Sequence, residues 1–74
     1  LAFFFAAHVY NKGDIAGAIG EYRATILANP KDFQAHQALA FIYRNQGLYD
    51  KSIREYRTVL SLVPWNTEAR NNLA

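Results

Sequence analysis

The side chains that could act as a nucleophile, a base or a metal ligand are few. Ser52 and Ser61 have no histidine near them in the sequence, and a serine nucleophile needs an adjacent base. His8 and Asp14 lie close together, but no nucleophile accompanies them. His8 and His36 are too few and too far apart to form a metal cage, and the chain has no cysteine. We therefore expect no catalytic residues, no metal and no cofactor.

Two further patterns are better explained by structure than by chemistry. The segment Gly13 to Gly17 contains glycine but lacks the lysine and the hydroxyl of a phosphate-binding loop. Glu21 and Glu55 are 34 residues apart, and a carboxylate repeated at a fixed interval indicates a repeated structure. We interpret His36 as a core-edge histidine bonded to a carbonyl rather than as a ligand. The expected protein is not an enzyme.

Charge and hydropathy limit the partners. Eight Lys and Arg against six Asp and Glu give a net charge of +2, and the densest basic stretch, Lys51, Arg54 and Arg57, includes Glu55. A nucleic-acid binder usually shows a clustered basic stripe, so we expect a solvated helix face and no nucleic-acid partner. The apolar run of residues 1–7 is far shorter than the ~20 residues that span a bilayer, so we expect no membrane partner. The lack of cysteine leaves the compartment open, with a cytoplasmic location favoured.

The chain repeats itself at an interval of 34 residues. Aligned at this offset, it gives eleven identities among forty overlapping pairs, including Gly13 with Gly47 and Pro30 with Pro64. The two glycines stand where a helix should end in a turn that often needs a positive φ. The two prolines cannot continue a helix. Asp32 and Asn66 follow as N-caps, so each unit is predicted to contain two helices.

Apolar residues recur with the period of a helix in every segment. The expected inward-facing residues are Ala2, Phe5, Ala6 and Val9; Ile15, Ala18, Ile19, Tyr22 and Ile26; His36, Leu39, Ala40 and Tyr43; Tyr49, Ile53, Tyr56 and Leu60, with Ser52 in a small slot; and Ala69 and Leu73. A β fold is disfavoured because strict alternation is missing. Gly17 and Gly20 should soften their helix by about 1 kcal/mol each relative to alanine.

These units resemble tetratricopeptide repeats. The resemblance rests on the segments Gly13–Ile19 and Gly47–Ile53, on a downstream aromatic and aliphatic residue in each unit, and on the closing prolines. It implies an all-α fold, a right-handed superhelical array of antiparallel helix pairs with about five helices. The expected units are residues 1–32 (an N-terminally incomplete repeat), 33–66 (a complete repeat) and 67–74 (the start of a third repeat or a capping helix). Pentatricopeptide repeats, which bind RNA, are disfavoured because the glycine before their closing proline is missing.

The resemblance also implies a binding surface. In this family the first helix of each repeat lines a concave face that binds a partner protein or peptide. The residues that would project from this face are Phe3, Ala7, Tyr10 and Asn11 in repeat one; Gln34, Gln37, Phe41, Arg44 and Asn45 in repeat two; and Glu68 and Asn71 in the third unit. Phe3 and Ala7 stand where the chaperone-binding version of the family has lysine and asparagine. A chaperone C-terminal tail is therefore not the expected partner.

The sequence leaves two alternative functions open. Phe3, Phe4 and Phe5 sweep about 200° of a helix, which is more than one core stripe can bury. Together with Leu73, they predict a longer array or a homo-oligomer that self-associates through its repeat edges. The other alternative is a regulatory module of a larger enzyme whose catalytic domain lies outside this segment.

Overall fold

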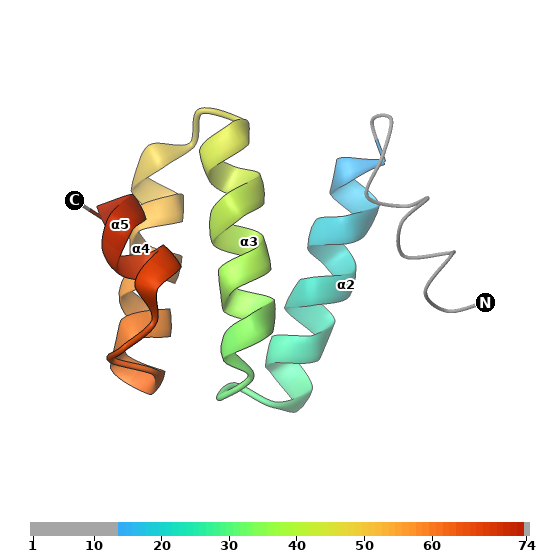
Figure 1. Ribbon diagram of the computed structural model, residues 1–74. Coiled ribbons are helices and arrows are strands. Elements are labelled where there is room, and N and C mark those ends of the chain that lie inside the picture. The colour runs from blue at the N-terminus through green and yellow to red at the C-terminus, as the bar shows by residue number, and fades with distance from the viewer. Residues whose placement is uncertain (1–13, 74) are drawn as a thin grey trace.

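The structure, a computed structural model, describes residues 14–73, and all its regular elements are helices. These are α2 (Ile15–Ala28), α3 (Phe33–Asn45), α4 (Tyr49–Leu62) and α5 (Thr67–Leu73). Figure 1 shows α2, α3 and α4 as a row with α5 in front of α4, and consecutive helices run in opposite directions. The predicted all-α class is confirmed. The helix expected before residue 13 lies outside the described residues, and the handedness of a longer superhelix stays a prediction.

The 34-residue interval recurs in the backbone of the α2–α3 turn and the α4–α5 turn. Asn29, after α2, has φ −144° and ψ 88°, and Val63, after α4, has φ −135° and ψ 83°. The Asn29 N–H donates to the Thr25 carbonyl at 2.8 Å, and the Val63 N–H donates to the Val59 carbonyl at 2.7 Å. The prolines that follow therefore end two equivalent helices in the same way.

The next helices begin with the predicted caps. The Asp32 side chain accepts a hydrogen bond from the Ala35 N–H at 3.1 Å, and the Asn66 side chain accepts one from the Ala69 N–H at 2.8 Å. Each cap pairs an amide that lacks a partner within its own helix.

The turn between α3 and α4 depends on Gly47. Its φ is +81°, a conformation that L side chains rarely adopt. The Leu48 N–H donates to the Tyr43 carbonyl at 2.9 Å, and the Gly47 N–H donates to the Arg44 carbonyl at 3.0 Å. This bonding pattern is a Schellman motif, and it sets the tight reversal between the two helices.

The core lies where α3, α4 and α5 meet. One cluster consists of Ala40, Tyr56, Val59 and Ala69, and a smaller one joins Ala18 of α2 to Ile42 of α3. Contacts are denser between α3 and α4 than between α2 and α3. Among the described residues, the small side chains of Ala18, Ala40 and Ser52 are buried, so the helices can approach closely.

Among residues 14–73, Tyr49 is the one predicted core residue that is exposed to solvent, with 64% of its surface exposed. It is the first residue of α4, and helical side chains tilt toward the N-terminus. Its side chain therefore leans away from the packed part of α4, where Ser52, Tyr56 and Val59 are buried. Val59, which the apolar stripe left out, is instead fully buried.

We expect opposite effects from alanine at two glycines. A Cβ at Gly20, inside α2, or at Gly47 would meet no atom within 4 Å, so neither change creates a clash. Gly20→Ala should raise the free energy of unfolding by about 1 kcal/mol through helix propensity. Gly47→Ala should lower it by about 1–2 kcal/mol because the left-handed backbone is strained for alanine. Urea denaturation followed by circular dichroism checks both, and equal effects of the two changes would contradict the assigned turn.

Candidate functional site

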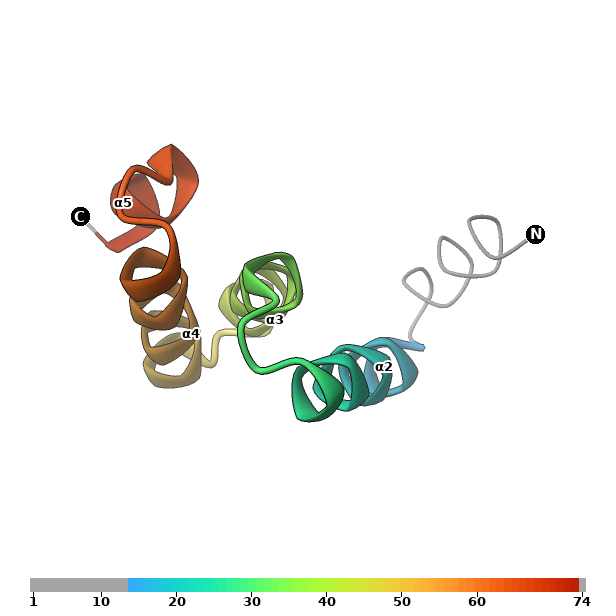
Figure 2. The ribbon, with the colours of Figure 1, turned by 90° about the horizontal axis from the view of Figure 1, so that it is seen from below.

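The predicted binding residues of the described region lie on α3 and α5. Figure 2 shows these two helices on one side of the row and α2 and α4 on the other. We call the surface of this side the α3–α5 face. The residues predicted for this face are Gln34, Gln37, Phe41, Arg44 and Asn45 of α3 and Asn71 of α5. The predicted contacts Phe3, Ala7, Tyr10 and Asn11 lie outside the described residues.

Side-chain hydrogen bonds join the two helices of this face. Gln37 donates from Nε2 to Glu68 Oε1 at 2.6 Å, and its Oε1 accepts from Asn66 Nδ2 at 3.0 Å. The Gln37 amide is thus used on both sides to hold α3 against α5. Gln37, Asn66 and Glu68 therefore form a hydrogen-bonded floor of the face, and Gln37 is not a free contact group.

Tyr56 lies beneath this floor, with only 1% of its surface exposed. Its hydroxyl makes a long contact of 3.5 Å with Glu68 Oε2. Burial raises the pKa of the Tyr56 phenol above 10.0, and the Glu68 charge adds to this, whereas the nearby Arg44 charge opposes it. Arg44, Tyr56 and Glu68 therefore share one electrostatic environment contributed by three helices.

The other predicted contact residues of this face are open to solvent. Phe41 is 39% exposed although it is in the middle of an otherwise buried apolar stretch. Gln34, Arg44, Asn45 and Asn71 are exposed, and Arg44 also lies in the last turn of α3, where a cation complements the helix dipole. The face thus combines an aromatic ring, a guanidinium and amides over a hydrogen-bonded floor.

Sequence reasoning missed how Asn66 takes part in this network. Asn66 was identified as an N-cap, which its side-chain oxygen confirms, but its Nδ2 also donates to Gln37. The signal was the choice of asparagine, since Asp32 at the equivalent position has no side-chain donor. The bond itself requires α3 and α5 to be neighbours.

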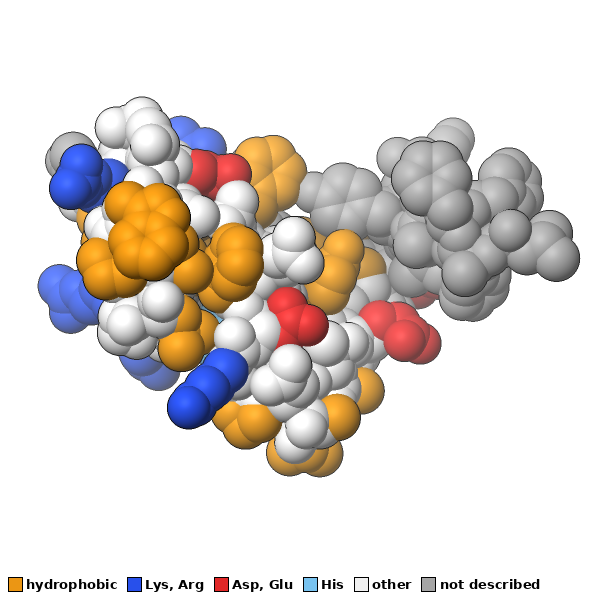
Figure 3. Space-filling view, turned by 60° about the horizontal axis from the view of Figure 1, so that its bottom comes forward, with side chains coloured by type: hydrophobic (Ala, Val, Ile, Leu, Met, Phe, Trp, Pro, Cys, Tyr) orange, Lys and Arg blue, Asp and Glu red, His pale blue; other side chains and the backbone are white. Residues whose placement is uncertain are grey.

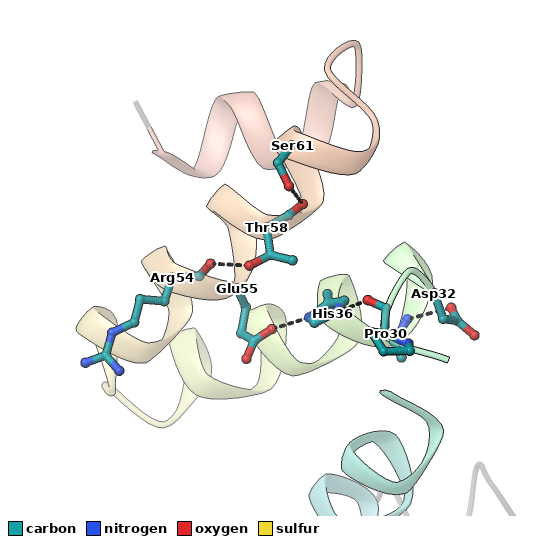
Figure 4. A network of polar contacts seen from close by, with 8 residues as sticks. Pro30, Asp32, His36, Arg54, Glu55, Thr58 and Ser61 are labelled. Carbon is teal, nitrogen blue, oxygen red and sulfur yellow. Dashed lines mark hydrogen bonds and ion pairs between the residues drawn. The ribbon is translucent and has the colours of Figure 1, made fainter. Parts of the chain in front are cut away.

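His36 confirms its predicted role and forms a second polar cluster (Figure 4). Its Nε2 lies 2.9 Å from the Pro30 carbonyl, and its Nδ1 lies 2.7 Å from Glu55 Oε1. Because a carbonyl only accepts, Nε2 carries a proton. His36 thus ties the α2–α3 turn to α4. Within residues 14–73, no group of acidic or histidine side chains could hold a metal ion, and every buried side-chain polar atom has a partner.

Comparison with known families identifies a repeat within the chain. The family model described as a tetratricopeptide repeat matches residues 21–54, a window of one repeat length that runs from α2 through α3 into α4. This chain carries a tetratricopeptide repeat. No curated protein matches the chain. Tetratricopeptide repeats are typically protein-interaction modules without catalytic activity of their own.

The described helices also bear on membrane association. None of the helices within residues 14–73 is both long and apolar enough to cross a bilayer.

Figure 3 shows that most of the visible Lys and Arg side chains lie on the side of α4 and α5, and that hydrophobic side chains are exposed among them. The surface is therefore chemically mixed on this side.

The raised pKa of Tyr56 predicts a loss of stability at alkaline pH. Above pH 10.0 the unfolded phenol ionises while the folded one keeps its proton, so the free energy of unfolding should fall as pH rises. Tyr56→Phe should remove this component and flatten the profile above pH 10.0. Urea denaturation at several pH values measures the slope. Tyr49→Phe, at an exposed position, should keep the wild-type slope, and parallel profiles for Tyr56→Phe and wild type would refute the assignment.

Proposed function

We propose that this tetratricopeptide segment binds a peptide or helix of a partner protein on the α3–α5 face and catalyses no reaction. The observation that carries the proposal is the exposed pair Phe41 and Arg44, which stands beside a floor whose hydrogen bonds are already satisfied. In the proposed array the repeat units are residues 1–32, 33–66 and 67–74. The array is right-handed, and this face is its concave side.

The chemistry of the face suits a peptide. Phe41 offers aromatic area, and aromatic and arginine side chains are the residue types that most often dominate binding energy. Arg44 can donate two parallel hydrogen bonds to a carboxylate. The exposed amides of Gln34, Asn45 and Asn71 can pair with either group of a peptide backbone because they both donate and accept.

The floor supports the proposal by being preorganised. Gln37, Asn66 and Glu68 already hold one another across α3 and α5, so they need not become ordered when a partner binds. Binding then costs less conformational entropy than it would on a loose surface. Phe3, Ala7, Tyr10 and Asn11 would extend this same face.

A double variant tests this face directly. Phe41→Ala with Arg44→Glu should abolish recovery of a specific partner by the longest natural form of the array, because it removes the aromatic anchor and reverses the charge. Affinity recovery from native lysate followed by mass spectrometry measures the loss. Photo-crosslinking from Gln34, which is exposed on α3, should mark the same partner.

The matched control is Leu48→Ala with Arg57→Glu. Leu48 is 42% exposed, close to the 39% of Phe41, and both control residues lie outside α3 and α5. The control should retain the partner, and circular dichroism should show equal helicity for both variants. Equal recovery by both baits, or equal loss from both, would overturn the assignment of the face.

A second candidate function is self-association, which one observation favours. Trp65, in the turn between α4 and α5, is 75% exposed, and large exposed apolar side chains often mark contact surfaces. If this turn joins copies of the array, Trp65→Ser should shift sedimentation velocity toward the monomer at high concentration. An unchanged sedimentation coefficient would eliminate this edge as the contact.

A further inference from the structure

A groove lies on the side of α3 that faces α2 and α4. It has a volume of about 440 Å³, within the range of ~300–1,000 Å³ typical of ligand clefts. Its floor is formed by Leu39, His36 and Tyr43 of α3, and its α2 wall includes Ile26 and Leu27. Figure 2 shows α2 and α4 on the side of the row opposite to α3 and α5. We call this hollow the α2–α4 groove, and it is distinct from the α3–α5 face.

The apolar part of the groove is open to a ligand. Leu27 is 86% exposed and Leu39, on the floor, is almost fully buried. A leucine or phenylalanine side chain entering here would cover Leu27 and Ile26, and burial of apolar surface favours association.

The adjoining part of the groove is basic. A second hollow of about 130 Å³ shares Arg23, Tyr43 and Glu55 with the first and adds Lys51 and Arg54. Glu55 is the one carboxylate among these residues, and its Oε1 is engaged by His36. Within residues 14–73, Arg23, Lys51 and Arg54 form no ion pair. Three cations thus surround a single carboxylate that already has a partner.

We infer that the α2–α4 groove binds an acidic peptide segment whose carboxylates face Arg23, Lys51 and Arg54 and whose apolar side chain enters beside Leu27. The charge of the basic hollow selects the acidic groups, and arginine in particular can pair with a carboxylate through two hydrogen bonds. The adjoining aliphatic surface selects a peptide over a nucleic acid. Bases need stacking platforms, and the Tyr43 ring already has Lys51 Nζ at 5.6 Å from its centroid.

Fluorescence polarisation of the full-length protein tests the inference. The probe is a labelled twelve-residue peptide of two leucines flanked by glutamates, compared with one in which glutamine replaces every glutamate and one in which alanine replaces both leucines. The acidic leucine peptide should bind most tightly, and its affinity should fall as salt is raised. Equal affinity for all three peptides, or no binding of the acidic one, would overturn the proposal.

Substitutions in and near the groove identify where the peptide probe binds. Arg23→Gln, Lys51→Gln and Arg54→Gln together should weaken binding about tenfold, because exposed ion pairs are individually weak but their losses add. Leu27→Gln should weaken binding of the acidic leucine peptide and leave the salt dependence of that binding unchanged. Arg57→Gln removes one charge from the same helix outside the groove and should have little effect. A loss with Arg57→Gln as large as that with Arg54→Gln alone would show nonspecific attraction and overturn the site.

The same assay separates this site from the proposed function. Phe41→Ala with Arg44→Glu should leave affinity for the acidic probe within about twofold, because both residues lie outside the α2–α4 groove. Loss of the probe with this variant would place it on the α3–α5 face and refute the inference. Displacement of the probe by single-stranded RNA that binds more tightly would refute the peptide assignment. Thermal unfolding by circular dichroism confirms that each variant is folded.

Discussion

The close approach of α3 and α4 is the constraint on which the other features depend. Ser52 of α4 donates from its hydroxyl to the Ala40 carbonyl of α3 at 2.8 Å, and both residues are buried. A side chain as short as serine can bond the backbone of another helix only where the two helices nearly touch. Gly47 supports this contact by reversing the chain in a few residues. Tyr56 and Val59 then reach across from α4 to pack with Ala69 of α5.

Because α3 is central in the row, its residues divide between two chemically different surfaces. Gln37 faces α5 and bonds Glu68, whereas His36, the preceding residue, bonds Glu55 of α4 and the Pro30 carbonyl. Adjacent positions on a helix are about 100° apart, so one residue step changes the neighbouring element. The α3–α5 face and the α2–α4 groove are thus separate surfaces of one helix, and each is held by its own polar cluster.

The sequence predicted the elements well because their signals are local. The caps Asp32 and Asn66 and the turn at Gly47 each act within a few residues, and the 34-residue interval repeated those signals. The prediction that Tyr49 is buried was wrong because periodicity does not account for a helix end, where fewer neighbours cover a side chain. The bonds of Gln37 and the two hollows beside Tyr43 could not be predicted, since they depend on how three helices are placed around α3. The binding role of the α3–α5 residues rests on the family resemblance and stays a prediction.

The two equivalent caps also show that neighbouring repeats are not chemically interchangeable. Asn66 binds Gln37 through a donor that its counterpart Asp32 lacks, and the residue 34 positions before Gln37 is Phe3. An aspartate and a phenylalanine cannot form the amide-to-amide bond, whatever their geometry. The repeat therefore conserves the cap-to-backbone bond, which every helix start requires, but changes the side chains that reach the face. An array built in this way presents an aperiodic surface on a periodic backbone, which is what recognition of one particular partner sequence requires.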